Sequence, residues 1–148
     1  MTNHFRWKSV ILIPILAGIA LAPVMAQSAA TQIDHARVYA AFAKGMPLLE
    51  TNNFKIHASR REIPGLAEVH TRDTYIVYVL EGAATLVTGG KALQAKTIAP
   101  DEIRGQSIEG GEVRHIVKGD VVVIPNGVPH WFKTVHGPLL YYVVKVTN

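Results

Sequence analysis

The sequence predicts an all-β domain, a barrel or a double-sheet jelly roll, with one short helix before it. From residue 53 onward the apolar residues recur with a period of two, as in strands whose alternate side chains face a core. Turn residues, chiefly Gly, Pro, Asn and Asp, interrupt these stretches roughly every ten positions, which is the spacing of short antiparallel strands.

The first 26 residues have the three-part pattern of a secretory signal peptide. Arg6 and Lys8 are basic, residues 10–22 are mostly apolar, and small residues precede a cleavage site after Ala26. The apolar run is shorter than the roughly 20 residues that a spanning helix needs, so we expect cleavage rather than a stable membrane anchor. The sequence therefore predicts a periplasmic or secreted protein.

Composition limits the remaining possibilities. A chain of 148 residues predicts a single domain, and without cysteine it has no disulfides. There are 15 Lys and Arg against 11 Asp and Glu; loss of Arg6 and Lys8 with the leader leaves 13 against 11, a net charge of +2. Because no basic stripe is interleaved with aromatic residues, nucleic acid is not expected as a partner.

In chain order, residues 27–52 are predicted to form a leader and a helix, and residues 53–148 a barrel. The helix is capped by Asp34 and ended by Gly45. Turns are expected at residues 64–65, 72–73 and 81–82, and residues 89–111 form an irregular excursion, a hairpin arm of undetermined role. Strands are expected over residues 54–61, 66–71, 74–80, 83–88, 113–117, 121–124, 131–135 and 139–146.

The segment from Gly119 to His130 fixes a histidine at the end of a strand and a tight turn. β-branched residues precede Pro125, and Gly127 completes the turn. The pattern of Gly, five residues, Pro, one residue, Gly, two residues and His resembles the second conserved motif of the cupin superfamily. The family motif usually continues to an Asn, whose place Thr134 takes here.

A first cupin motif is expected upstream, and the match there is partial. Gly65 and Gly82 occupy its glycine positions and His70 its second histidine position, whereas Glu68 stands at the first histidine position and Tyr75 at the glutamate position. The resemblance implies a small single-domain bacterial cupin: a double-stranded β-helix (jelly-roll barrel) with a short N-terminal helix, a metal inside the barrel and pairing into dimers.

The residues themselves indicate the same site. Alternation along a strand puts Glu68 and His70 on one face, and His130 can meet them inside a barrel. Two imidazoles and one carboxylate suit a divalent transition metal: Fe, Mn, Zn or Ni. Tyr75 is a candidate fourth ligand or hydrogen-bonding acid, so the candidate catalytic residues are His130, His70 and Tyr75. A buried ionised Glu68 costs several kcal/mol unless it is paired, and a metal would offset that cost.

Structural roles are the alternative for each of these residues. Glu68 can pair with Arg60 or Arg104, and His70 and Tyr75 can belong to the barrel core without a metal. Arg104 lies in the excursion. It can belong to an arm that extends into solvent, or it can bind a substrate carboxylate through both guanidinium nitrogens. His57 and His115 lie in predicted strands and can join the pocket, but structural roles are expected for both.

The sequence thus predicts a metal-dependent enzyme of the oxygenase or isomerase kind, acting on a small molecule. A non-catalytic periplasmic module for binding or sensing a small ligand is a second hypothesis, and a metal-free lyase or isomerase with a histidine base is a third. The outward residues of one strand, Ile76, Tyr78 and Leu80, are all apolar. Such a face is rarely left in water, which predicts a homodimer.

Overall fold

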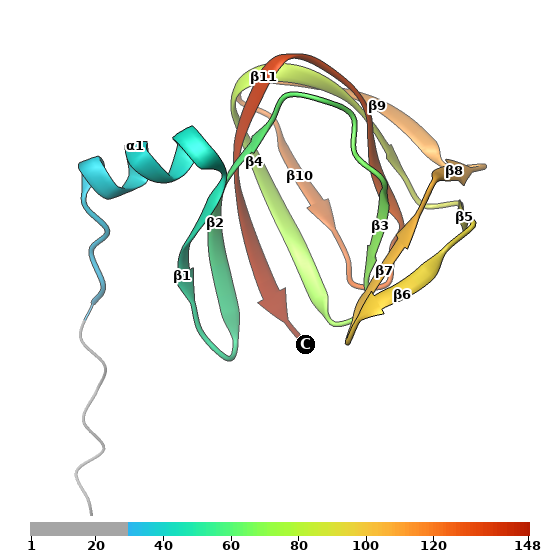
Figure 1. Ribbon diagram of the computed structural model, residues 1–148, viewed down its shortest axis with the longest axis horizontal. Helices are drawn as coiled ribbons and strands as arrows, with labels where there is room; N and C mark the ends of the chain where they lie inside the picture. Colours follow the sequence, from blue (N-terminus) through green and yellow to red (C-terminus); the bar gives the residue numbers. More distant parts are fainter. Residues whose placement is uncertain (1–29) are drawn as a thin grey trace, which may run out of the picture. The chain divides into compact units, whose positions relative to one another are not determined.

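The structure, a computed structural model that describes residues 30–148, confirms the expected all-β architecture with one short helix (Figure 1). Gln32–Asn148 form one compact unit. The elements are α1 (His35–Lys44), β1 (Met46–Glu50), β2 (Phe54–Arg61), β3 (Ala67–His70), β4 (Asp73–Thr88), β5 (Lys91–Leu93), β6 (Lys96–Ala99), β7 (Glu102–Gly105), β8 (Ser107–Glu109), β9 (Glu112–Val117), β10 (Val121–Ile124) and β11 (His130–Thr147).

Helix α1 begins and ends where its capping residues predict. The Asp34 side chain accepts a hydrogen bond from the Arg37 backbone N–H at 2.9 Å, and Gly45 adopts the left-handed conformation at φ 68° that closes many helices. Strand β1, which follows at once, was not predicted. Its Pro47 stops the helix, yet Pro is tolerated because β1 lies at the edge of the sheet beside β2.

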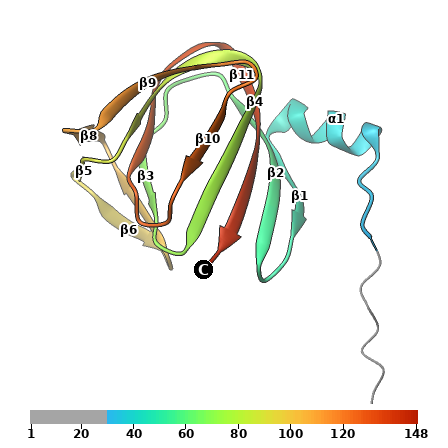
Figure 2. The same cartoon turned by 180° about the vertical axis from the view of Figure 1, so that it is seen from behind.

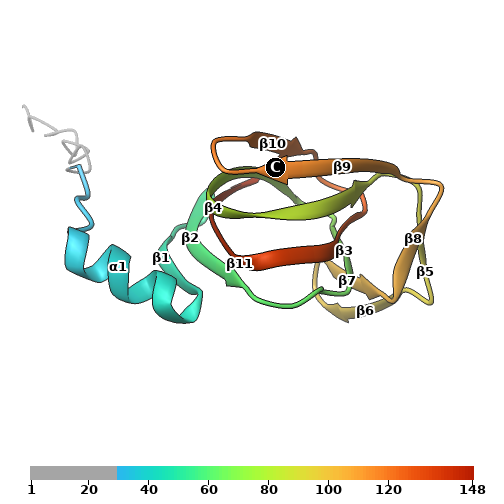
Figure 3. The same ribbon diagram turned by 90° about the horizontal axis from the view of Figure 1, so that it is seen from above.

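The main sheet has nine strands and curves around an interior (Figures 1 and 3). Strand β11 pairs antiparallel with β2, β3 and β4, and is therefore the central strand of the fold. Strands β9 and β10 both pair with β4, as the view from behind shows (Figure 2). A cluster of buried apolar side chains fills part of the interior: Tyr75, Val77, Val79, Ala84, Leu86, Ile116, Ile124, Phe132, Leu139, Tyr141 and Val143.

In two places, two successive strands expected from the sequence form one long strand. The turn predicted at residues 81–82 is therefore wrong. Strand β4 runs through Gly82 without reversing, and β11 runs through the predicted break between 135 and 139. Gly82 has φ 80°, and the pairing of β4 with β11 shifts register between His136 and Leu140. The glycine and this irregularity bend both strands together where the sequence indicated a turn.

The excursion over residues 89–111 folds back onto the barrel. Strand β5 pairs with β8 in a separate two-stranded sheet, while β6 pairs with β7 and β7 pairs with β3. The interpretation of this stretch as hairpin strands is correct, but its β7 is part of the main sheet rather than an arm in solvent. This pairing places Arg104 directly opposite Glu68.

No helix within residues 30–148 is long and apolar enough to cross a membrane. The signal peptide expected over residues 1–26 lies outside the described residues.

The bend at Gly82 generates a stability prediction. A Cβ at this position would overlap the Pro138 carbonyl oxygen, in addition to the strain of the positive φ. We expect Gly82→Ala to lower the free energy of unfolding by at least about 3 kcal/mol, as strain and overpacking add. Chemical denaturation of the purified variant measures this.

Gly137→Ala is the matched control, because Gly137 has φ 71° and no atom lies within 4 Å of the place that a Cβ would take. It should cost only about 1 kcal/mol, the strain of the left-handed conformation alone. Equal losses in the two variants would show that the close approach to Pro138 does not constrain the bend.

Candidate metal centre

Three side chains that the sequence singled out meet inside the barrel: Glu68, His70 and His130. Glu68 and His70 are two positions apart on β3 and so project from the same face, while His130 is the first residue of β11 and the register partner of Glu68. One ligand atom from each of the three lies within 4.8 Å of the others.

The separations between these atoms fit a metal site. Glu68 Oε2 lies 3.3 Å from His70 Nε2 and 3.8 Å from His130 Nε2. Ligands held about 2.1 Å from one metal ion are about 3.0–3.4 Å apart, depending on the geometry, so the Glu68–His70 separation lies in this range and the Glu68–His130 separation is longer. His130 and His70 are both buried, and Glu68 is 14% exposed at its side chain.

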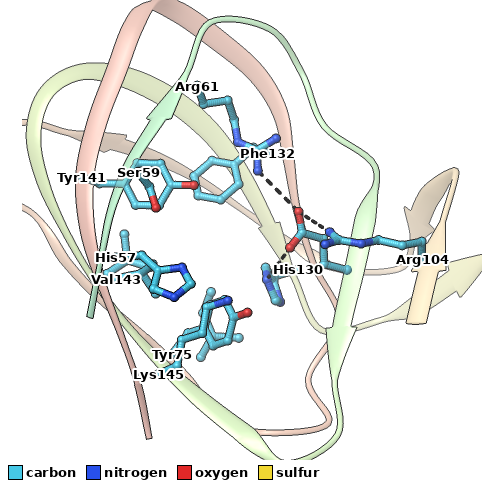
Figure 4. Close-up of a pocket in the computed structure, with 13 residues that line it drawn as sticks. His57, Ser59, Arg61, Tyr75, Arg104, His130, Phe132, Tyr141, Val143 and Lys145 are labelled. Atoms are coloured by element: carbon cyan, nitrogen blue, oxygen red, sulfur yellow. Dashed lines mark hydrogen bonds and ion pairs between the residues drawn. The ribbon is translucent and has the colours of Figure 1, made fainter. Parts of the chain in front are cut away.

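The other oxygen of Glu68 is held by two arginines. Glu68 Oε1 lies 2.5 Å from Arg104 Nη1 and 3.4 Å from Arg61 Nη2 (Figure 4). The two oxygens of this carboxylate therefore have different partners: Oε1 is bound to guanidinium groups, and Oε2 faces two imidazoles. Arg104 is a partner of Glu68, as one interpretation of the sequence proposed, whereas Arg60 is not; Arg60 pairs with Glu62 instead.

The carboxylate of Glu68 is ionised at any pH near neutrality. Burial would raise its pKa, but the hydrogen bond with His70 and the positive charges of Arg104 and Arg61, joined by that of His130 once it is protonated at low pH, outweigh burial and lower the pKa to about 2. An anionic oxygen therefore points at the two imidazoles, as metal binding requires.

His130 is oriented and kept neutral by its surroundings. Its Nδ1 lies 3.3 Å from the carbonyl oxygen of Val128, to which a protonated Nδ1 donates, and this leaves the Nε2 lone pair directed at Glu68. Burial lowers the pKa of His130 to about 4, although the charge of Glu68 opposes this. A neutral imidazole with a free Nε2 can act as a metal ligand or as a base.

Tyr75 lies beside the group rather than among its ligand atoms. Its ring stacks on that of His70 with centroids 4.4 Å apart, and its centroid is 5.4 Å from that of His130. Burial and the negative charge of Glu68 raise its pKa, so the phenol stays protonated. Tyr75 can therefore donate a hydrogen bond but is a poor anionic ligand, and its catalytic role stays a prediction.

A small cavity adjoins Glu68, Tyr75 and His130 (Figure 4). The sequence did not predict that Arg61 and Lys145 line it. Their signal was present, since Lys145 interrupts an otherwise mostly apolar strand and Arg61 shares a face of β2 with His57. The residues lining it are His57, Ser59, Arg61, Glu68, Tyr75, Val77, Arg104, Ile124, His130, Phe132, Tyr141, Val143 and Lys145.

The two other histidines considered from the sequence are not part of the group. His57 borders the cavity, but its Nε2 lies 3.0 Å from a carboxylate oxygen of Glu50, and burial lowers its pKa. His115 is exposed on β9 with its ring centroid 6.0 Å from that of His136. His57 therefore joins the cavity lining, as one interpretation of the sequence allowed, whereas His115 does not.

The burial of His130 generates a pH prediction for the metal-free protein. Below pH 6.5 the unfolded chain binds a proton at this residue, while the folded protein does not until near pH 4. The free energy of unfolding should therefore fall as the pH drops through this window, by up to about 3 kcal/mol. Denaturation at several pH values in the presence of a chelator measures the slope.

His130→Asn provides the comparison, because it removes the titrating group and keeps a polar side chain. Between roughly pH 6.5 and 4.5 its stability should depend much less on pH, since Glu68 takes up protons only at lower pH. The same slope in both proteins would contradict the burial of a neutral His130.

Comparisons with known proteins support the fold. Residues 25–148 match the family model described as Cupin. No curated protein sequence matches the chain. Among solved structures, a Bacillus halodurans protein is 15% identical with a TM-score of 0.53, and the match covers 70% of each chain. KdgF from a Halomonas species is 18% identical with a TM-score of 0.51, and the match covers 70% of this chain and 79% of the KdgF chain.

A Neisseria meningitidis protein is 12% identical with a TM-score of 0.52, covering 79% of this chain and 100% of its own. At these identities the structural matches show a common fold. The family match, by contrast, spans the whole barrel with both motif segments and the Glu68, His70 and His130 group within it. This chain belongs to the cupin family.

Proposed function

We propose that Glu68, His70 and His130 bind one divalent transition metal and that the cavity beside them is the active site of a metal-dependent enzyme acting on a small molecule. The observation that carries the proposal is that the arginines bind only one oxygen of the Glu68 carboxylate and leave the other free. Its Oε2 faces two imidazole nitrogens at 3.3 and 3.8 Å in a buried setting, where an ionised oxygen gains most from a cation.

The donor set fits Fe, Mn, Zn or Ni, because it combines two imidazoles with one carboxylate and leaves further positions open. Such a metal, when bound, acts as a Lewis acid on a substrate oxygen or as a site for oxygen activation. Arg104 and Arg61 fix the carboxylate through Oε1, and the Val128 carbonyl fixes the ring of His130. These contacts are of the kind that orient metal ligands and tune their affinity.

The other cavity residues have roles that follow from their chemistry. Tyr75 keeps its proton and stands against His70, where it can donate a hydrogen bond to a bound molecule. Phe132 and Val143 are buried apolar parts of the wall and exclude water from it. The site therefore combines a cation position, a hydrogen-bond donor and an apolar surface.

A metal-free lyase or isomerase is the second candidate, and one observation favours it. The arginines already satisfy the charge of Glu68, so the carboxylate does not require a metal for its stability. His130 would then be the general base, because it is neutral at pH 7 with a free Nε2.

We also propose that the protein forms a homodimer through the outer face of β4 and β10. Ile76 and Tyr78 are 37% and 44% exposed, and they are register partners of Val123 and Val121, which are 59% and 61% exposed. Four neighbouring apolar side chains on one sheet face form a surface typical of a protein interface.

The metal proposal is tested by the metal content of Glu68→Gln. We expect the native protein to bind about one equivalent of a transition metal, and the variant to bind it at least roughly a hundredfold more weakly, because a neutral amide replaces the anionic ligand. Elemental analysis and competition with a chelating dye measure content and affinity.

His115→Ala is the matched control, since it removes an exposed histidine of β9 outside the group. Its metal content should equal that of the native protein. Native protein without metal that keeps its activity in chelator would support the metal-free enzyme, and unchanged affinity in Glu68→Gln would remove Glu68 from the site.

The dimer proposal is tested by charge at the β10 face. We expect the native protein to be dimeric at micromolar concentration and Val121→Lys with Val123→Lys to be monomeric, because facing charges would be desolvated at the interface. Multi-angle light scattering measures both masses. Val113→Lys, on exposed β9, is the comparison that should stay dimeric. A monomeric native protein would refute the proposal.

A further inference from the structure

Lys145 is a charged residue in the barrel wall for which the proposed metal site gives no role. It lies near the end of β11, where its register partners are Lys55 on β2 and Tyr75 on β4. Its ammonium group lies 4.9 Å from the centroid of the Tyr75 ring, and Figure 4 shows the two side chains together on one side of the cavity. A lysine half-buried in this way normally has a carboxylate partner.

The carboxylates near Lys145 are all engaged by other groups. Asp73 Oδ2 lies 3.1 Å from Lys55 Nζ, and its Oδ1 accepts a hydrogen bond from the Thr147 hydroxyl at 2.8 Å. Glu68 is bound by two arginines, and Glu102 is paired with Arg104. Within residues 30–148 no ion pair of Lys145 is found, so its charge is left without a partner.

Lys145 lies between two hollows of the protein. It borders the inner cavity and also an outer depression at the same end of the barrel, which Asp73, Glu102 and His70 line as well. Among the described residues it is the one common to both. The inner cavity is lined mostly by polar side chains, Glu68 and His130 among them, and has an apolar part that includes Val77 and Val143.

We propose that Lys145 binds the carboxylate of the substrate, so that the enzyme acts on a small organic acid whose carbon skeleton extends toward Glu68, His70 and His130. An incoming anion supplies the partner that the folded chain does not provide. The carbon skeleton of an organic acid would lie against the apolar part of the lining, which includes Val77 and Val143. Burial and the charge of Lys55 lower the pKa of Lys145, and a bound carboxylate would reverse that effect.

This inference rests on the proposed function, because the part of the substrate that reacts would lie at the proposed metal site. Binding of the substrate carboxylate by Lys145 does not itself need a metal. Butyrate and its neutral amide, butyramide, are suitable probes because they share one skeleton and differ in charge. Nuclear magnetic resonance titration of the full protein, as purified and after treatment with a chelator, gives both dissociation constants.

We expect butyrate to bind more tightly than butyramide in both preparations. Lys145→Met should weaken butyrate binding roughly ten- to hundredfold, the range for loss of a charge-assisted hydrogen bond, and leave butyramide binding unchanged. Methionine suits the position because its thioether also packs on an aromatic ring. Lys145→Arg keeps the charge and should keep butyrate binding within about threefold of the native value.

Lys133→Met is the matched control. Lys133 is on the same strand and also lies over an aromatic ring, that of Trp131, but it is exposed and lines neither hollow. Its removal takes away the same charge and should not change butyrate binding. Equal butyrate affinity in Lys145→Met and the native protein, or equal affinity of the native protein for butyrate and butyramide, would overturn the proposal.

Metal analysis of the same samples separates this inference from the proposed function. Lys145→Met should hold at least as much metal as the native protein, because Lys145 is not among the candidate ligand residues and its positive charge opposes a dication. Native protein that takes up no metal would refute the metal site, while the chelator-treated titrations would still decide whether Lys145 binds a carboxylate. Melting temperatures within a few degrees of the native value show that each variant is folded.

Discussion

The candidate site depends on the pairing of β3 with a strand on each side. Glu68 faces Arg104 across β7 and His130 across β11, so one residue receives a cation from one neighbour and an imidazole from the other. A shift of either register by one residue would turn the partner side chain to the opposite face of the sheet. The register of β3 with its two neighbours therefore also brings the candidate ligand atoms together, and fold and site cannot vary independently here.

The carboxylate at residue 68 changes the electrostatics relative to an imidazole at the same place. A neutral histidine would tolerate burial beside His70 and His130, whereas an anion needs compensation. Arg104 and Arg61 provide it on Oε1 and leave Oε2 free. This explains how the chain departs from the family's usual ligand residues while keeping the barrel. It also shows why the excursion matters, since it supplies Arg104 through β7.

The sequence predicted what depends on local pattern and not what depends on pairing between distant strands. Strand periodicity, the caps of α1 and the rigid turn before His130 are local, and they located the barrel and the Glu68, His70 and His130 group. The passage of β4 through Gly82 depends on how closely Pro138 approaches it, and the role of Arg104 depends on the pairing of β7 with β3. Neither contact leaves a signal within a short stretch of sequence.

The proposed metal would bind Oε2 of Glu68 while the two arginines bind Oε1, so the metal and the arginines would interact through charge rather than compete for the same atom. Two guanidinium groups close to a metal position reduce its affinity for a dication, because like charges repel in a medium of low dielectric constant. Lys145 adds a further unpaired positive charge to the same cavity. An anionic substrate would relieve this repulsion and strengthen metal binding in return, since coupling between two ligands is reciprocal. The charge distribution thus favours a site in which metal and acid bind better together than either does alone.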